Sequence, residues 1–485
     1  MNQRLHIIAG PVAAVIVALI LRFFTLAPVE AQLMSAVVVI MAWWWMTEAV
    51  PLAVTSLLPM LLLPVFGIAT AKDTARQYMD NILFLFIGGF ILAFALEKWN
   101  LHKRIAYLIL SKVGTKPSSI LLGVMLTSFF ISMWISNTAT VMLLLAAVMA
   151  LVSEMDVHLE SSDAKRKLGA ALLIGLAYSA SIGGLATLVG TPTNMIFYRE
   201  YQRAFPMAND MDFMHWVIIG FPVAMLLLIT AYFTLRLMFC RGINTEVVDR
   251  FYFRYKLKSL GKWSREERII AWVFLITVIL WFTRSDLDFG SCTIPGWATA
   301  IFGEKSKYIE DSTVAILAAV VLFLIPAADK KQKLIEWKDA ERLPFDIILL
   351  FGGGFALAYG FEVSGLSDWI ASGFSHLKGT NPVVLVFGLS VLICIISEFA
   401  SNVASIQLMI PVLLAGYNGL GVSALFLLVP ATLSASLGFM LPVATAPNTI
   451  VFGTKRIRTA EMMRAGLVVD IAGVLIITAV AALVL

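Results

Sequence analysis

Long, continuous apolar runs restrict the fold of this 485-residue chain more than any other feature of its sequence. Hydrophobic residues make up 60% of the chain and charged residues 14%, whereas soluble proteins have about 45–50% and about 25%. A membrane β-barrel would show segments of about 10 residues with alternating polarity. We therefore predict an all-α polytopic membrane protein with about eleven transmembrane helices, at 7–26, 33–50, 52–66, 83–98, 168–198, 215–240, 269–283, 313–328, 345–363, 424–452 and 461–485.

Two further apolar stretches, 118–153 and 382–414, are interrupted near the middle by polar residues. A polar cluster inside the bilayer is costly unless the backbone unwinds there and lines a cavity. Asn and Ser suit such a turn because their side chains hydrogen-bond nearby backbone groups. We predict two re-entrant helical hairpins with their tips at 136–138 and 401–403.

The distribution of basic residues predicts how the chain lies in the membrane. With a cytoplasmic N-terminus, eleven crossings and two re-entrant hairpins, 27 of the 36 lysines and arginines fall in cytoplasmic segments and 9 fall outside. Cytoplasmic loops are enriched in Lys and Arg, so we predict a protein of the cell inner (plasma) membrane with its C-terminus outside. The basic loop 241–268 fits a cytoplasmic anchor without a special partner, and a patch for lipid headgroups or nucleic acid is the alternative. We expect no nucleic-acid partner.

The two halves of the chain carry the same motifs in the same order. Residues 86–97, 136–139 and 190–194 align with 351–362, 401–404 and 444–448, at offsets of 265, 265 and 254 residues. In the predicted topology the two copies have opposite orientations. Inverted repeats with interrupted hydrophobic segments are typical of secondary transporters.

Two of the predicted spans contain a proline that breaks the helix, Pro192 within 168–198 and Pro447 within 424–452. Proline removes an amide donor and disfavours helix in the residue before it, so we predict discontinuous helices. The C-terminal ends and unwound carbonyls of such helices can hold a small cation, and the N-terminal ends attract anions.

The motifs at the tips and breaks contain hydroxyls, amides and backbone groups but no Lys, Arg or His. A bound anion would be neutralised by helix dipoles and a co-bound cation, and ligation by oxygen alone suits a hard cation such as Na⁺. The alternative is that these residues only hold helices together, but four motifs in two symmetric pairs favour a site. Glu398 fits a relay or a structural acid equally well, whereas Asp470 favours a snorkelling or capping role.

Motifs for catalysis and for ATP binding are missing from the sequence. It contains no Walker A motif, no HExxH and no grouping of Ser, His and Asp, so we predict that the protein is not an enzyme and uses no cofactor. The glycines at 352–354 lie inside an apolar span and lack the Lys-Ser/Thr of a P-loop, which indicates close helix packing. A channel or a membrane-embedded enzyme is the competing class.

Four segments resemble the divalent anion/sodium symporter (DASS, INDY-type) family: 132–140, 190–194, 398–402 and 441–448. The resemblance covers essentially the whole chain. It implies eleven spans plus two re-entrant hairpins, a homodimer, and an elevator-type motion of a transport domain against a scaffold. It also implies sodium-coupled transport of dicarboxylates of the succinate, malate and fumarate class. A sodium-independent dicarboxylate exchanger and a sulfate or tricarboxylate transporter of the same family are the alternatives.

The resemblance further implies which residues form the site. Na⁺ would bind in two places, at Ser132, Ser136, Asn137 and Gly190 and at Ser397, Ala400, Asn402 and Ala444. Substrate carboxylates would meet Asn137, Thr138, Asn402, Val403, Thr191 and Ala446. Val403 stands where many bacterial members have Thr, and Ala446 where some have Pro, which leaves the choice among dicarboxylate, tricarboxylate and sulfate open.

The repeats and the resemblance together predict five segments. They are N-terminal scaffold helices (1–82), a first inverted repeat (83–240) with hairpin 118–153 and broken helix 168–198, a cytoplasmic basic linker (241–268), scaffold helices that start the second half (269–344), and a second repeat core (345–485) with hairpin 382–414 and broken helix 424–452.

Overall fold

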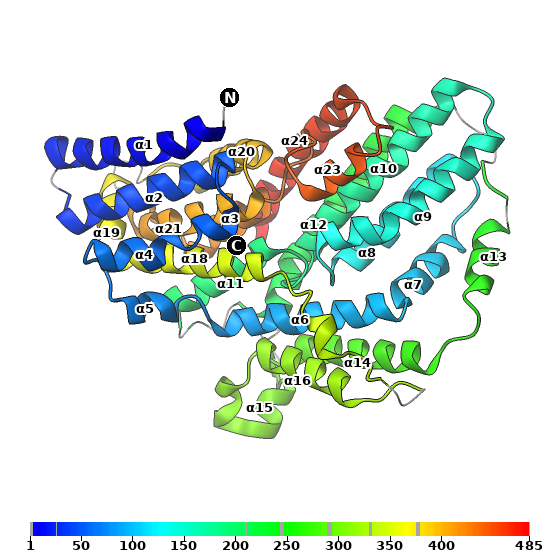
Figure 1. Ribbon diagram of the computed structural model, residues 1–485, viewed down its shortest axis with the longest axis horizontal. Coiled ribbons are helices and arrows are strands. Elements are labelled where there is room, and N and C mark those ends of the chain that lie inside the picture. Colours follow the sequence, from blue (N-terminus) through cyan, green and yellow to red (C-terminus); the bar gives the residue numbers. More distant parts are fainter. Residues whose placement is uncertain are drawn as a thin grey trace.

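The chain folds almost entirely into helices, and Figure 1 shows them packed into one elongated body. The computed structural model describes residues 3–25, 27–206, 208, 211–242, 247–249, 251–288, 293–328, 332–374 and 379–484. Two short strands, β1 (Leu287–Asp288) and β2 (Thr293–Ile294), form an antiparallel pair. The helices are α1 (Gln3–Phe24), α2 (Val29–Thr47), α3 (Leu52–Thr55), α4 (Leu58–Val65), α5 (Ala71–Arg76), α6 (Asn81–Lys98), α7 (Leu101–Leu110), α8 (Pro117–Ser132), α9 (Asn137–His158), α10 (Ser162–Leu185), α11 (Pro192–Ala204), α12 (Phe213–Leu235), the π-helix η1 (Arg236–Cys240), α13 (Tyr252–Ser259), α14 (Arg265–Phe282), α15 (Trp297–Phe302), the 3-10 helix η2 (Gly303–Tyr308), α16 (Asp311–Leu324), α17 (Trp337–Ala340), α18 (Phe345–Val363), α19 (Leu366–Phe374), α20 (Pro382–Phe399), α21 (Asn402–Leu420), α22 (Ala424–Ser434), α23 (Ala446–Phe452) and α24 (Thr459–Val484).

Within the described part of the chain, ten helices are long and apolar enough to cross a membrane. The predicted all-α polytopic fold is confirmed. Individual spans differ from their predicted bounds: 52–66 divides into α3 and α4, and 313–328 gives the 14-residue α16. Helix α16 ends at Leu324, shortly before Pro326, which cannot donate a backbone hydrogen bond.

Both interrupted stretches form pairs of helices joined by short turns, as predicted. In the first pair α8 ends at Ser132 and α9 begins at Asn137, and in the second α20 ends at Phe399 and α21 begins at Asn402. Figure 1 places the first pair in the right half of the molecule and the second in the left half. The helices on the two sides of each turn have 16 to 22 residues, so each tip lies between two long helices.

Both predicted breaks are present as well. Helix α10 stops at Leu185 and α11 starts at Pro192, whereas α22 stops at Ser434 and α23 starts at Ala446. The short pieces cross between the halves, because α11 packs on α21 and α22 while α23 packs on α9 and α10. This exchange joins the two repeats around their breaks.

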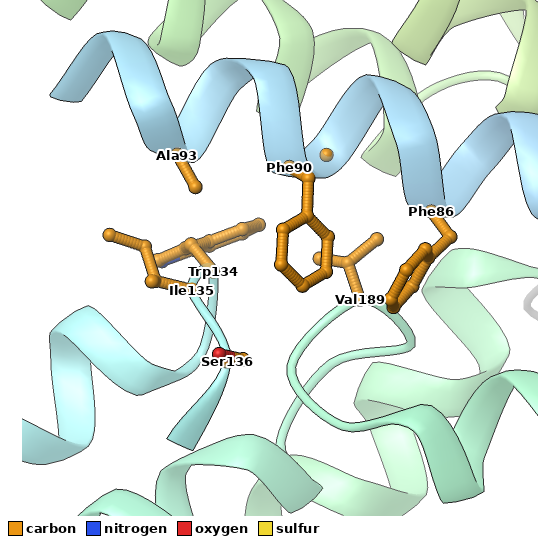
Figure 2. Close-up of a pocket in the computed structure, with 8 residues that line it drawn as sticks. Phe86, Phe90, Ala93, Trp134, Ile135, Ser136 and Val189 are labelled. Carbon is orange, nitrogen blue, oxygen red and sulfur yellow. The ribbon is translucent and has the colours of Figure 1, made fainter. Parts of the chain in front are cut away.

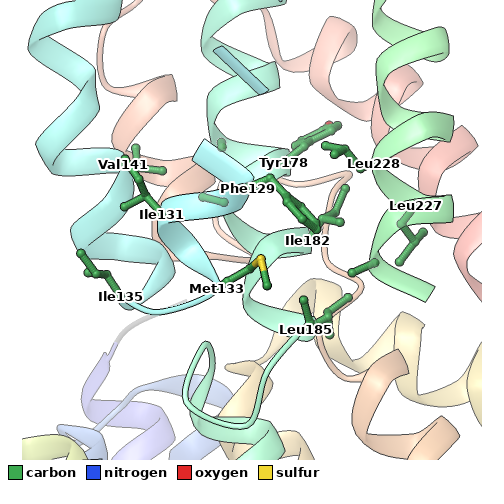
Figure 3. Packing of buried hydrophobic residues seen from close by; sticks show 14 of the residues in the cluster. Phe129, Ile131, Met133, Ile135, Val141, Tyr178, Ile182, Leu185, Leu227 and Leu228 are labelled. Atoms are coloured by element: carbon green, nitrogen blue, oxygen red, sulfur yellow. The ribbon is translucent and has the colours of Figure 1, made fainter. Parts of the chain in front are cut away.

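Helix α10 is the central pillar of this arrangement. All of its residues from Leu168 to Leu185 are buried, because small residues along its length let neighbouring helices approach. Figure 3 shows the first hairpin packed on it through Phe129, which lies next to Ile182, while Ile131 faces Val141 of the hairpin's other helix. The first tip therefore rests on a helix that has no lipid-facing side.

Paired glycines bring the repeated spans α6 and α18 against their neighbours. A Cβ added at Gly88 would lie 2.6 Å from the backbone of Ala315 on α16, and one at Gly353 would lie 2.4 Å from the carbonyl oxygen of Ser56. Side chains cannot be accommodated at such distances. The glycine-rich segment of α18 is thus a site of close helix packing, as the sequence indicates.

Candidate functional site

The two hairpin tips have the same internal hydrogen bond. Ser132 Oγ donates to Asn137 Oδ1 at 2.8 Å, and Ser397 Oγ donates to Asn402 Oδ1 at 2.8 Å. Both serines are fully buried, and both asparagines are half-buried. Each bond spans the turn, so it fixes the asparagine relative to the end of the preceding helix.

Each tip asparagine also begins a helix, α9 for Asn137 and α21 for Asn402. The positive end of a helix dipole therefore lies at each tip, where it favours an anion. Among the described residues, neither asparagine Nδ2 has a hydrogen-bond partner. Two free amide donors at two helix N-termini can receive carboxylate oxygens without any basic side chain.

The breaks are held by a second pair of asparagines. Asn194 Nδ2 donates to the carbonyls of Gly184 (3.0 Å) and Thr187 (2.8 Å). Asn448 Nδ2 donates to the carbonyls of Gly438 (3.0 Å) and Leu441 (3.1 Å). In both breaks the acceptors lie ten and seven residues before the asparagine, so one geometry fixes both unwound segments.

The first predicted Na⁺ set comes together around Gly184. A Cβ added there would lie 2.3 Å from Asn137 Oδ1, and one added at Gly190 would lie 2.6 Å from the Gly184 carbonyl oxygen. Thr187 Oγ1 donates to the Met133 carbonyl across the same contact. Ser136 caps α9 by accepting from the Ala139 amide, so the hairpin tip and the break backbone form one cluster of oxygens.

The second predicted set comes together around Gly438. Ser397 Oγ lies 2.5 Å from the Ala435 carbonyl oxygen and 2.8 Å from Asn402 Oδ1. A Cβ added at Gly438 would lie 3.4 Å from Ala444 Cβ and 3.5 Å from the Ser397 carbonyl oxygen. Ala400, the last member of this set, is buried in extended backbone between α20 and α21.

These atoms fit a hard cation. Two acceptor oxygens, Asn402 Oδ1 and the Ala435 carbonyl oxygen, share the single hydroxyl hydrogen of Ser397, which can serve only one acceptor well at a time. Nearby, the buried Asn448 Oδ1 has no hydrogen-bond partner among the described residues. Convergent and unsatisfied oxygens are the ligands that a cation such as Na⁺ takes in place of water.

Helix α6 closes the first cluster on one side. Figure 2 shows Phe86 and Phe90 of this helix facing the turn with Trp134 and Ser136 and the loop with Val189. The cavity between them has a volume of about 10 Å³, which is room for about one water molecule. Aromatic side chains therefore cover the side of the first tip that faces α6.

The two halves meet between the breaks. Thr193 Oγ1 and Ser436 Oγ lie 3.1 Å apart, and Tyr178 OH donates to the Phe439 carbonyl at 2.6 Å. No hydrogen bond between described residues joins the two tips to each other. The broken helices thus connect the two predicted Na⁺ sets.

The residues expected to meet substrate differ in exposure. Thr191 is buried just before α11, Thr138 and Val403 are half-buried in the first turns of α9 and α21, and Ala446 is exposed at the start of α23. All four therefore lie at or next to helix N-termini. Their common feature is the dipole end rather than a charged side chain.

Glu398 is built into the second break. Its carboxylate oxygens accept from the amides of Met440 (2.8 Å) and Leu441 (2.9 Å), and its side chain is buried. This geometry supports the structural reading of this acid.

The snorkelling or capping role expected for Asp470 is wrong. Asp470 is 4% exposed within α24 and lies near Glu398. Its side chain interacts with the Glu398 carboxyl group and with the Phe439 backbone. The side chain packs inward because this face of α24 contacts α12, α20 and α22 instead of lipid headgroups.

The sequence interpretation assigned no role to Asn194, Asn448 or Gly184. A signal for the two asparagines was present, since they occupy equivalent positions in the repeated motif. Gly184 lies outside the motif 190–194, but the same offset of 254 residues pairs it with Gly438. Its importance depends on a contact with the first tip that only the packing of α10 against the hairpin creates.

Comparison with known proteins gives a consistent result. A family model described as "Sodium:sulfate symporter transmembrane region" matches residues 3–484. The chain is 36% identical to a sodium-dependent dicarboxylate transporter SdcS of Staphylococcus saprophyticus, over 99% of this chain and 91% of the relative. It is 35% identical to an SdcS of Staphylococcus aureus, over 98% of this chain and 90% of the relative.

Solved structures share the fold at low sequence identity. MtrF of Neisseria gonorrhoeae matches with a TM-score of 0.58 and 14% identity, over 85% of this chain and 83% of that one. The YdaH transporter of Alcanivorax borkumensis matches with a TM-score of 0.55 and 14% identity, over 84% and 85%.

Proposed function

This chain belongs to the family defined by the sodium:sulfate symporter transmembrane region, and from this premise we propose that it is a secondary transporter that moves dicarboxylates together with Na⁺. The observation that carries the proposal is the duplicated tip, in which a buried serine fixes the oxygen of an asparagine at a helix N-terminus. The naming of relatives as sodium-dependent dicarboxylate transporters supports the choice of substrate.

In the proposed mechanism the cation and the anion share the tip asparagines. Oδ1 of Asn137 and of Asn402 faces the serine and break oxygens that would surround Na⁺, while Nδ2 remains free for a substrate carboxylate. Na⁺ bound at the oxygen side would supply the positive charge that the site lacks and strengthen the attraction of the helix N-termini for the dianion. Loading of ion and substrate would thereby be coupled.

We also propose how the molecule moves and assembles. The hairpins, breaks and short helices α11 and α23 form one interlocked unit, which suits an elevator-type transport domain moving against the scaffold segments 1–82 and 269–344. The family resemblance suggests a homodimer, and the distribution of basic residues suggests a cytoplasmic N-terminus and an external C-terminus.

Uptake into proteoliposomes tests the function. An inward Na⁺ gradient should drive accumulation of labelled succinate, malate and fumarate, and an equal K⁺ gradient should not. Uptake that needs internal substrate and ignores Na⁺ would instead identify an exchanger. Preferred transport of citrate or sulfate would identify one of the other substrate classes, and single-channel conductance would overturn the transporter assignment.

A further inference from the structure

An apolar groove of about 390 Å³ lies outside the site described above. Its walls come from one face of α7, from Val124 and Thr127 of α8, from the middle of α9 and from the linker helix α13. Most of the lining side chains are Ala, Leu and Val, and they include Ala106, Leu144 and Ala147. A dicarboxylate would gain nothing from such walls, whereas a hydrocarbon chain would be favourably buried there.

Two lysines on the groove lining are free of carboxylate partners. Lys103 of α7 is exposed, and Lys256 of α13 is half-buried with its Nζ 5.6 Å from the centre of the Tyr252 ring. Neither forms an ion pair with any described carboxylate. Glu154 lies near Tyr252 but does not line the groove. The groove therefore combines an apolar interior with two uncompensated positive charges.

The groove is a built feature, because the linker is fixed on both sides of α13. Before α13, the Val247 amide donates to the Thr115 carbonyl at 3.2 Å. After α13, the buried Arg104 donates through Nε to Glu267 (2.9 Å) and through its other nitrogens to linker carbonyls, including that of Gly261 (3.1 Å). Breaking a buried pair such as Arg104–Glu267 is strongly destabilising, so α13 is held against α7.

Helix α13 itself has the composition of a helix at a membrane interface. Tyr255 is 71% exposed and lies beside the exposed Arg254 and Lys258, and the N-cap residue Phe251 is 63% exposed. Exposed aromatic rings beside basic side chains are typical of helices at the level of lipid headgroups. The open side of the groove is thus next to a segment suited to contact lipid.

We propose that this groove binds an anionic phospholipid, with an acyl chain along the Ala, Leu and Val walls and the phosphate between Lys103 and Lys256. Charge complementarity selects an anionic headgroup over a zwitterionic one, and the apolar walls select a lipid over a free phosphate. The site assigns a specific partner to part of the basic linker. Because α9 is an arm of the first hairpin, the lipid would contact both the hairpin and the linker.

Native mass spectrometry of delipidated protein tests the proposal with phosphatidylglycerol and phosphatidylcholine of the same acyl chains. Wild-type protein should retain phosphatidylglycerol more tightly. The double variant Lys103→Gln/Lys256→Gln should bind it about 30-fold more weakly, at about fivefold for each lysine near an anionic headgroup. The control Arg254→Gln/Lys258→Gln, which removes two exposed charges beside the groove, should stay within about twofold of wild type.

A second variant probes the chain site with both lysines intact. Ala147→Phe places a ring in the groove and should weaken binding of phosphatidylglycerol without loss of thermal stability. Equal binding of the two lipids, unchanged binding in either groove variant, or an equal loss in the control would each overturn the proposal. If the double variant does not fold, each single lysine variant should still show its fivefold effect. These readouts do not depend on transport, so the lipid site and the proposed function can fail separately.

Discussion

The two breaks hold equivalent positions in the repeats, yet they are stabilised by different chemistry. The first is short, from 186 to 191. It is held by the close contacts of Gly184 with Asn137 and Gly190, and by the hydrogen bond from the Thr187 hydroxyl to the Met133 carbonyl. The second is longer, from 435 to 445, and a buried carboxylate, Glu398, accepts from two of its amides. The asparagine bonds are shared, and the remaining supports are particular to each half.

The difference teaches which features the inverted fold requires. Two features recur in both halves with the same hydrogen-bond distances. They are the serine–asparagine pair at each tip (2.8 Å) and the bond from the break asparagine to a glycine carbonyl (3.0 Å). The supports that differ compensate for the length of the break, because a longer unwound segment exposes more amides that need an acceptor. We therefore expect the shared atoms to carry transport and the unshared atoms to set local stability.

The largest effect should come from the shared tip. Asn137→Ala and Asn402→Ala each remove an oxygen and an amide that would meet charged ligands. A hydrogen bond to a charged group contributes about 1.5–3 kcal/mol, so sodium-driven succinate uptake should fall by about 100-fold in either variant. The control Asn418→Ala, exposed at the far end of α21, should transport normally. Wild-type uptake by both tip variants would contradict the shared role.

Substitutions at two equivalent glycines can show how tightly each break is packed. Gly184→Ala would place its Cβ 2.3 Å from Asn137 Oδ1, whereas Gly438→Ala would place its Cβ at an ordinary contact distance of 3.4 Å from Ala444. Overpacking of this kind costs about 1–3 kcal/mol. We expect Gly184→Ala to lower both the melting temperature and uptake, the latter by about tenfold, and Gly438→Ala to change neither. Similar losses in both variants would mean that the second break is as tightly packed as the first.

The supports that differ can be tested against each other. Glu398→Gln keeps the shape of the side chain but leaves one acceptor oxygen for two amides, and an unsatisfied buried donor costs about 1–3 kcal/mol. Thr187→Val removes a donor from a carbonyl, which tolerates the loss better. The melting temperature should therefore fall more for Glu398→Gln than for Thr187→Val. The half-saturating Na⁺ concentration of Glu398→Gln should also rise, because Glu398 holds the second break, which contains oxygens proposed to bind Na⁺. A larger loss for Thr187→Val would reverse the assignment of the supports.

The sequence predicted most of the architecture because its signals were local. Each of these signals predicts local structure from a stretch of about twenty residues. They are the apolar runs, the polar residues at 136–138 and 401–403, and the prolines of the breaks. The contacts of Gly184 with Asn137 and of Glu398 with Met440 and Leu441 join separate segments, so no local pattern could announce them. Asp470 was misread for the same reason, since its burial depends on three other helices.

The smallest effect concerns a repeated residue that lies far from both breaks. Glu97 and Glu362 align in the repeats, and each pairs with an arginine of another element, Arg342 and Arg203 respectively. One partner in each pair is more than half exposed, and exposed ion pairs contribute about 0–1 kcal/mol. Arg203 also keeps its contact with Glu200. Glu97→Gln and Glu362→Gln should therefore shift the melting temperature only slightly, with Glu362→Gln the milder, and uptake should stay within about twofold. A loss of uptake as large as that of Asn137→Ala would mean that a residue shared by the repeats is important for transport even at the surface. We expect instead that the importance of a shared residue depends on its burial and on how many polar atoms converge on it.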